Sequence, residues 1–128
     1  MADDMKTPRI LKDRDQQPSW GLPKADMAGF WRGRCNGMEA TRCSAGFVIM
    51  PFGQTTPLHS NTAEHIIIMI EGDIEFTIEG EAFPLEPRDM LFIPAHAKYV
   101  YTNKGRATAT FISVLGQVDS PPKGTYYD

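Results

Sequence analysis

The amino-acid sequence predicts an all-β domain built as an antiparallel sandwich or barrel. About nine or ten short apolar runs are separated by turn residues at intervals of roughly eight to twelve residues. In runs such as 74–78, apolar and polar side chains alternate, as in a strand with one buried face. No segment sustains the 3.6-residue period of an amphipathic helix. A chain of 128 residues is long enough for a single domain with a substantial core.

The composition argues against several classes of function. The net charge is −3 and the pI is about 5.6, so the chain has no overall basic field for nucleic acid. No apolar run approaches the roughly 20 residues of a membrane span. The charged N-terminal residues lack the apolar region of a signal peptide. We therefore expect a cytoplasmic protein whose partner is a small-molecule ligand or substrate, and neither nucleic acid nor a membrane.

Residues 1–32 are expected to form an N-terminal arm and loop. The first part, residues 1–19, is polar and cannot bury much apolar surface by itself. Ile10 and Leu11 are apolar, so this part can dock as a short strand on a neighbouring surface. Glycine and proline in residues 20–31 favour a loop whose aromatic side chains serve as packing anchors.

Residues 33–116 carry the β pattern and form the expected domain, and residues 117–128 form a tail rich in proline and glycine that we expect to be a surface strap. Within the domain, Gly72 and Gly80 mark tight turns because glycine tolerates a positive φ. The predicted strands cover residues 38–42, 45–51, 58–61, 65–71, 74–78, 82–85, 90–93, 99–103 and 107–115.

Large apolar residues in these strands predict an interior that also forms the apolar wall of a small-molecule pocket. Such pockets combine an apolar lining with a few polar groups, although a small barrel also fills its own interior with side chains. The residues expected inside are Phe47, Ile49, Ile67, Met69, Phe76, Phe92, Tyr101 and Phe111.

The two cysteines, Cys35 and Cys43, leave two interpretations open. They can pair across a hairpin, or they can remain thiols, which a reducing cytosol favours. A zinc site would need a partner at short spacing, such as C-x2-C, and the sequence has none.

The longest motif, GQTTPLHSNTAEHIIIMIEG, resembles the first motif of the cupin superfamily. That motif runs Gly, five residues, His, one residue, His, three or four residues, Glu, six residues, Gly. Gly53, His59 and Gly72 fall on their motif positions. Asn61 stands at the position of the second histidine, and His65 stands at the position of the glutamate.

A second stretch, EPRDMLFIPAHAKYVYTN, resembles the second cupin motif, which runs Gly, five residues, Pro, one residue, Gly, two residues, His, three residues, Asn. Pro94 and Asn103 fall on their motif positions. Arg88 and His96 stand at the two glycine positions, and Tyr99 stands at the position of the histidine.

This resemblance, over roughly residues 45–115, implies a single-domain jelly-roll β-barrel of the cupin type. It also implies a small-molecule enzyme, such as a metal-dependent oxygenase, isomerase or lyase. The apolar interior favours a small and partly apolar organic substrate. The alternative is a metal-free cupin that binds or senses a small ligand without turnover. Cupin domains are frequently dimers, and we expect a homodimer in which Ile10 and Leu11 pack on the partner's sheet and cover its edge.

The resemblance assigns metal-ligand positions to His59, Asn61, His65 and Tyr99. Imidazole suits Fe, Zn, Ni or Mn, and no organic cofactor is expected. Tyr99 can bind as phenolate to a strong Lewis acid such as Fe(III), whereas Asn61 is a weak neutral oxygen ligand. In a site without metal, His59, His65 and Tyr99 would hydrogen-bond one another or hold an organic ligand.

His96 follows Pro94 and is expected at the rim of the pocket. As an imidazole it can act as a general acid or base near neutral pH, or it can be an ordinary surface histidine. The catalytic candidates are therefore His96 and Tyr99.

Overall fold

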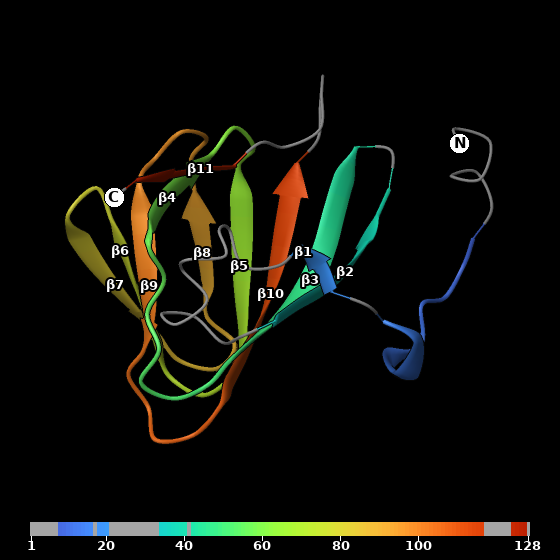
Figure 1. The fold of residues 1–128 in the computed structure, drawn as a ribbon, viewed down its shortest axis with the longest axis horizontal. Helices are drawn as coiled ribbons and strands as arrows, with labels where there is room; N and C mark the ends of the chain where they lie inside the picture. The colour runs from blue at the N-terminus through green and yellow to red at the C-terminus, as the bar shows by residue number, and fades with distance from the viewer. Residues whose placement is uncertain (1–7, 17, 21–33, 41, 117–123, 128) are drawn as a thin grey trace.

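Two antiparallel sheets make up the fold (Figure 1). The computed structural model describes residues 8–16, 18–20, 34–40, 42–116 and 124–127. The six-stranded sheet, called the large sheet below, contains in spatial order β1 (Pro18–Trp20), β2 (Arg34–Glu39), β3 (Cys43–Met50), β10 (Ala109–Gly116), β5 (His65–Glu71) and β8 (Met90–Ile93). The five-stranded small sheet contains β11 (Gly124–Tyr127), β4 (Leu58–Asn61), β9 (Tyr99–Asn103), β6 (Ile74–Ile78) and β7 (Glu81–Leu85).

This arrangement confirms the all-β prediction and is consistent with a jelly roll, although the described strands form two sheets and no closed barrel. Most predicted strands lie where the sequence places them. Two strands fall outside the 33–116 span, because β1 lies in the predicted arm and β11 in the predicted tail. A short 3-10 helix, Asp13–Asp15, precedes β1. Among the described residues, we find no helix with the length and apolar character that a membrane crossing requires.

The core lies between the two sheets and is rich in aromatic rings. Phe76 of β6 stacks on Tyr101 of β9, with ring centroids 4.9 Å apart. Phe111 of β10 reaches across from the large sheet and meets Phe76 edge-on at 5.5 Å. Offset and edge-to-face aromatic contacts of this kind add to the free energy of burial. The remaining fully buried side chains include Val48, Met50, Ile67, Met69, Ile74, Ile93 and Ala109.

Two expectations about the interior are wrong. Phe47 is 38% exposed and Ile49 is only partly buried, because β3 turns Val48 and Met50 to the core. Phe92 is 54% exposed, and its neighbour Ile93 is the buried residue. Side chains alternate between the faces of a strand, so choosing the wrong parity reverses every side chain in it.

The outer face of the large sheet is apolar. Ile66, Ile68 and Ile70 of β5 alternate with its buried residues, and they lie beside residues of β8 and β10 in register. Because solvated sheet faces usually carry polar side chains, this face is unusual. We call this set the apolar outer face, and its members are Ile66, Ile68, Ile70, Met90, Phe92, Ile112 and Val114.

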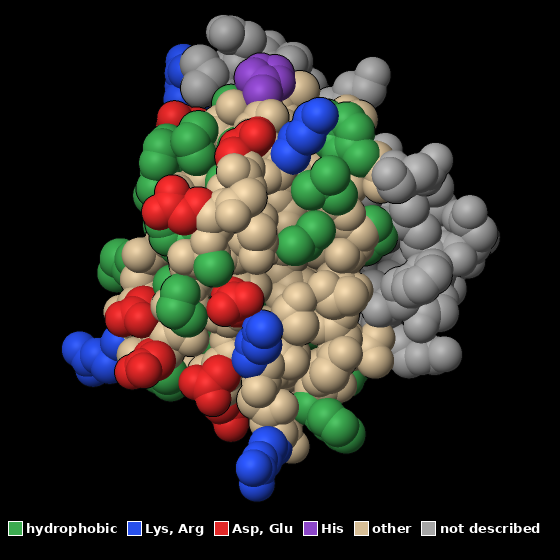
Figure 2. Space-filling model, turned by 90° about the vertical axis from the view of Figure 1, so that its left-hand side faces the viewer, with side chains coloured by type: hydrophobic (Ala, Val, Ile, Leu, Met, Phe, Trp, Pro, Cys, Tyr) green, Lys and Arg blue, Asp and Glu red, His purple; other side chains and the backbone are tan. Residues whose placement is uncertain are grey.

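The small sheet turns a polar face outward. The outward residues of β6, Glu75 and Thr77, alternate with its buried residues. Figure 2 shows acidic and basic side chains scattered over the side of the molecule that β6 and β7 form. This face is the solvated one that the alternation of polar residues predicts.

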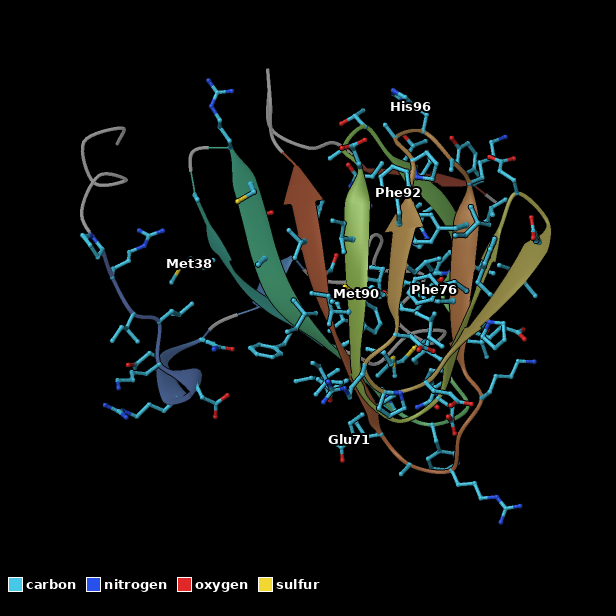
Figure 3. All side chains as sticks on the ribbon, turned by 180° about the vertical axis from the view of Figure 1, so that it is seen from behind. Met38, Glu71, Phe76, Met90, Phe92 and His96 are labelled. Atoms are coloured by element: carbon cyan, nitrogen blue, oxygen red, sulfur yellow. The ribbon has the colours of Figure 1, made fainter. Side chains whose placement is uncertain are left out.

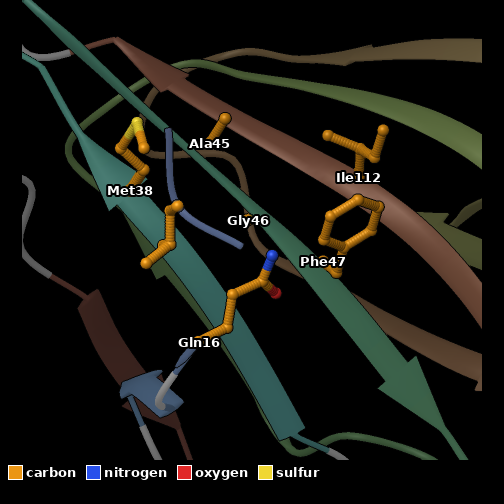
Figure 4. Close-up of a pocket in the computed structure, with 7 residues that line it drawn as sticks. Gln16, Met38, Ala45, Gly46, Phe47 and Ile112 are labelled. Atoms are coloured by element: carbon orange, nitrogen blue, oxygen red, sulfur yellow. The ribbon is translucent and has the colours of Figure 1, made fainter. Parts of the chain in front are cut away.

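The N-terminal segment lies on the large sheet of its own chain. Leu11 and Gln16 line a pocket there with Met38, Phe47 and Ile112 (Figure 4). The adjacent Ile10 is 79% exposed, so only one of the two predicted anchors is partly covered by the same chain. Packing of this arm on a partner subunit stays a prediction. The predicted aromatic anchors at residues 20–31 lie almost entirely outside the described residues.

The cysteines do not face each other across the β2–β3 hairpin. In register, Cys35 lies opposite Val48, and Cys43 lies opposite Gly116. Cys43 is exposed and free. The disulfide alternative is therefore excluded by strand register.

Several turns carry the left-handed backbone conformation, and glycine occupies only some of them. Gly72 has φ +92°, and a Cβ atom there would lie 2.7 Å from the Cβ atom of Ala109. Arg88 and His96, which stand at glycine positions of the second motif, have φ 79° and 70°. The turns thus keep a backbone that suits glycine even where another residue stands.

Asn103 stabilises the turn between β9 and β10. Its side-chain nitrogen donates hydrogen bonds to the carbonyls of Met50 at 3.0 Å and Ala107 at 2.9 Å. Its side-chain oxygen accepts a hydrogen bond from the amide of Gly105 at 2.9 Å. This buried side chain satisfies its hydrogen bonds and joins β9 to β3 and to the loop before β10.

Candidate functional site

His59 and Tyr99 meet across the pair of strands β4 and β9. The two residues are partners in strand register, and their ring centroids are 4.2 Å apart. Nδ1 of His59 lies 2.8 Å from the carbonyl oxygen of Pro57, which makes Nδ1–H the donor in the neutral ring. In that tautomer the lone pair is on Nε2, the nitrogen able to bind a metal or accept a proton.

His65 reaches the same place from the large sheet. It begins β5, is 5% exposed, and its ring centroid lies 5.9 Å from that of Tyr99. Its Nδ1 atom is buried without a hydrogen-bond partner. An unsatisfied buried polar atom costs about 1–3 kcal/mol. The structure therefore brings His59, His65 and Tyr99 together, with one imidazole nitrogen that the described chain leaves unsatisfied.

Both imidazoles are held in the neutral form near neutral pH. Burial lowers the pKa of His65 from 6.5 to about 4, and the nearby His59 contributes a smaller lowering. Burial also lowers the pKa of His59, and the hydrogen bond to Pro57 partly offsets this change. Neutral imidazole is the form that coordinates metals and accepts hydrogen bonds.

An aromatic wall surrounds these polar groups. Tyr101 lies 6.1 Å from His59 between ring centroids, and Phe76 lies 6.3 Å from Tyr99. Figure 3 shows Phe76 in the interior between the sheets. The site therefore combines a few polar atoms with an apolar lining, as small-molecule sites generally do.

Asn61 and His96 lie at the margin of this group. Oδ1 of Asn61 accepts a hydrogen bond from the amide of Ala63 at 2.9 Å and so stabilises the turn between β4 and β5. The amide of His96 donates to the carbonyl of Asn61 at 2.7 Å, while the side chain of His96 is exposed (Figure 3). The structure does not bring His96 into the buried group, and the ligand role of Asn61 stays a prediction.

The described part of the site contains no carboxylate. Glu64, which is one residue from the motif's glutamate position, is exposed. Among the described residues, no group of three or more His, Cys, Asp and Glu side chains is placed to hold a metal ion. A metal at this site would therefore depend on the phenol of Tyr99 together with the two imidazoles.

A family model for the cupin domain matches residues 46–115, more than half of the chain. The chain belongs to the cupin family. No curated protein sequence matches this cupin. The match confirms the family that the two motifs resemble.

Solved structures support the cupin fold. The Cnp3 cupin domain of Schizosaccharomyces pombe is 20% identical, with a TM-score of 0.63 over 79% of this chain and 71% of that chain. A salicylate 1,2-dioxygenase from Pseudaminobacter salicylatoxidans is 16% identical, with a TM-score of 0.68 over 81% of this chain and 34% of that one. A vicilin from Corylus avellana is 16% identical, with a TM-score of 0.73 over 91% of this chain and 35% of that one.

These similarities establish the fold and leave the reaction open. This cupin spans 34% and 35% of the dioxygenase and vicilin chains, so it corresponds to a part of each. The similar structures include enzymes, such as the dioxygenase, and proteins that are not enzymes, such as the vicilin.

One contact next to the site was not predicted from the sequence. Ser60, which follows His59, is buried, and its Oγ lies 2.9 Å from the hydroxyl of Tyr127 in β11. The GTYY segment of β11 has residues that favour strands, which is the only local signal for this contact.

Proposed function

We propose that this cupin is a small-molecule enzyme that works with a bound transition metal, Fe, Zn, Ni or Mn, held by His59, His65 and Tyr99. The observation that carries the proposal is the buried Nδ1 of His65, which lacks a partner beside His59 and Tyr99. A ligand bound to this nitrogen would remove the cost of burying it unsatisfied.

The donor set fits a metal in chemical terms. His59 donates from Nδ1 to a backbone carbonyl, the second contact that metal-binding histidines usually make. Burial lowers the pKa of both imidazoles, which favours the neutral form that binds a metal. Asn61 remains a weaker candidate ligand, because its oxygen already stabilises a turn. A bound metal ion would supply Lewis-acid polarisation of a substrate oxygen.

The residues of the chain account for substrate binding and proton handling. The aromatic wall around Tyr101 and Phe76 would hold the apolar part of a substrate and exclude water. The described donor set lacks a carboxylate, so an acidic group on the substrate would balance the charge of a metal there. As a phenolate ligand Tyr99 can accept a hydrogen bond from the substrate, and we keep His96 as a general acid or base at the margin of the site. Oxygenase, isomerase and lyase reactions all fit this description.

Binding without turnover is the second candidate function. It is favoured by the replacement of the one charged family ligand, the glutamate, by His65, because three neutral polar side chains can hold an organic ligand by hydrogen bonds alone. In that function His59, His65 and Tyr99 form the polar end of an apolar pocket.

Metal analysis of the purified protein separates the two functions. We expect about one metal ion per site, lost in His59→Ala, while the fold survives because the core does not depend on His59. His96→Ala, which removes an exposed imidazole outside the donor set, should keep the metal. If wild-type protein takes up none of Fe, Zn, Ni, Mn or Cu, metal-dependent function is ruled out.

Tyr99→Phe is the sharper test of the oxygen ligand. The substitution removes one oxygen and hardly changes the shape of the side chain. An Fe(III)-loaded protein should show a tyrosinate charge-transfer band that this variant loses or shifts. An identical absorption spectrum in both proteins would remove Tyr99 from the donor set.

We also propose that this cupin is a homodimer that joins through the apolar outer face. The outward residues of this face on β5, β8 and β10 carry no charge, so the face suits contact with another uncharged surface. A second copy of this chain provides such a surface, because it has the same apolar outer face. Met90 and Phe92 of the edge strand β8 are 71% and 54% exposed (Figure 3). Glu71 and Asp89, at the ends of these strands, oppose an anionic membrane surface.

Sedimentation at tens of micromolar tests the dimer. Phe92→Glu places a charge on the apolar outer face and should shift the protein to monomers. Thr77→Glu places the same charge on the polar face of the small sheet and should leave the dimer intact. A monomeric wild-type protein would contradict the proposal.

A further inference from the structure

The C-terminal strand lies beside the strand that carries His59. In the order of the small sheet, β4 stands between β11 and β9 (Figure 1). Tyr126 is the register partner of His59 on one side, and Tyr99 is its partner on the other. The position of His59 therefore depends on both neighbours of a strand that is only four residues long.

Two contacts of Tyr127 connect β4 with the residue that precedes β9, on the side away from the site. The hydroxyl of Tyr127 lies 2.9 Å from Oγ of Ser60 in β4. Nζ of Lys98 lies 4.5 Å from the centre of the Tyr127 ring, a cation–π contact. Ser60 follows His59 and Lys98 precedes Tyr99. Because side chains alternate along a strand, these contacts lie behind the His59–Tyr99 pair.

We propose that Tyr127 is a positioning residue that holds β4 against β9 and so keeps the ring of His59 beside that of Tyr99. The proposal rests on the proposed function of His59 and Tyr99 as ligands. Partners in the second layer of a metal site typically change metal affinity about 10- to 100-fold when they are removed. Tyr127 would affect metal affinity indirectly, because it positions the strand that carries His59 and does not contact the metal.

Binding of Co²⁺, a spectroscopic probe of the site, tests the proposal in the full chain. Tyr127→Ala removes both contacts and should weaken Co²⁺ binding about 10- to 100-fold and alter the visible absorption of the bound ion. Tyr127→Phe keeps the ring below Lys98 and loses only the hydroxyl. Its affinity for Co²⁺ should therefore lie between those of the wild-type protein and Tyr127→Ala. Thr125→Ala, an exposed position on the same strand, should behave as wild type.

An NMR measurement decides the proposal without metal. The nuclear Overhauser effect between the rings of His59 and Tyr99, 4.2 Å apart, should weaken in Tyr127→Ala. The effect between Phe76 and Phe111, 5.5 Å apart in the core, should stay the same. Loss of both signals would mean general disruption and would count against a positioning role.

The outcomes separate this proposal from the proposed function. If wild-type protein binds no Co²⁺, the metal function fails, and the ring-to-ring signal alone decides the role of Tyr127. If Tyr127→Ala does not fold, Tyr127→Phe and Ser60→Ala take its place in the Co²⁺ and NMR measurements. Each of these variants removes one partner of the hydrogen bond between Tyr127 and Ser60. Unchanged Co²⁺ affinity and unchanged His59–Tyr99 signal in a folded variant would overturn the proposal.

Discussion

The turns of the fold and the polar side chains of the site have opposite relations to stability. At Gly72 the backbone requires glycine, and the fold depends on it. At His65 a buried nitrogen lacks a partner, so the side chain lowers the stability of the empty protein. Arg88 and His96 stand between these extremes, because they occupy turns that glycine would suit better. Folding and binding therefore rest on separate positions, which can be altered separately.

The largest expected effect is at Gly72. Gly72→Ala combines the cost of a positive φ, about 1–2 kcal/mol, with the close approach to Ala109, about 1–3 kcal/mol. We expect the free energy of unfolding in urea to fall by about 2–5 kcal/mol. Gly80→Ala, where φ is +85° and nothing lies within 4 Å, should lower it by only about 1–2 kcal/mol. Equal losses at the two positions would show that the contact with Ala109 is unimportant.

The pH dependence of stability is the next largest effect. The unfolded chain protonates His65 below its ordinary pKa of 6.5, whereas the folded chain does so only below about 4. Between these values the unfolded state holds more protons, so stability rises with pH, by up to about 1.4 kcal/mol per pH unit. His59 acts in the same direction because its pKa is also lowered.

Urea unfolding of metal-free protein at several pH values between 4 and 7 measures this rise. His65→Leu should make the dependence shallower, with the remainder due to His59, which faces His65 together with Tyr99. Stability that is flat or falls with rising pH in wild-type protein would contradict the burial of neutral imidazoles.

His65→Leu should also change stability at neutral pH. Removal of the unsatisfied nitrogen should raise the free energy of unfolding of the metal-free protein by about 1–3 kcal/mol. The same variant should lose binding of the metal or organic ligand. Phe111→Leu, a core substitution outside the polar group, serves as the control, because it should lower stability and keep binding. A destabilised His65→Leu protein would show that the nitrogen has a partner in solution.

The smallest expected effect is at His96. His96→Gly relieves the strain of a positive φ of 70° and should raise the free energy of unfolding by about 0.5–1 kcal/mol. The gain is smaller than the strain relieved, because glycine also increases the conformational entropy of the unfolded chain. His96→Ala keeps the strained conformation and should give no gain. A comparison of the two in thermal unfolding separates the backbone from the imidazole. If His96→Gly gains stability and loses activity, the imidazole has a chemical role.

Local patterns predicted most of the fold. The apolar run of β5 and the alternation in β6 are strong signals, and their bounds match the structure. The orientation of β3 was not predictable, because both parities of this strand are apolar. Phe92 was misplaced for the same reason, since Leu91 and Ile93 flank it with equally apolar side chains. β11 was missed because a four-residue strand has too few positions to show a period.

The site was predictable only through the family resemblance. Spacing alone does not bring His65 of one sheet to His59 and Tyr99 of the other, because that depends on how the two sheets pack. The unsatisfied nitrogen and the contact between Ser60 and Tyr127 are properties of the folded chain, and no sequence pattern indicates either.

The division of the site between the two sheets has a consequence for how readily the sheets separate from each other. His65 lies on the large sheet, whereas His59 and Tyr99 lie on the small sheet. A ligand that contacts all three residues would link the sheets at one end, so separation there would have to break the ligand's contacts first. Amide hydrogen exchange in β4 and β5 should then slow in proportion to ligand occupancy, while exchange in β2 and β7 stays near its rate in the empty protein.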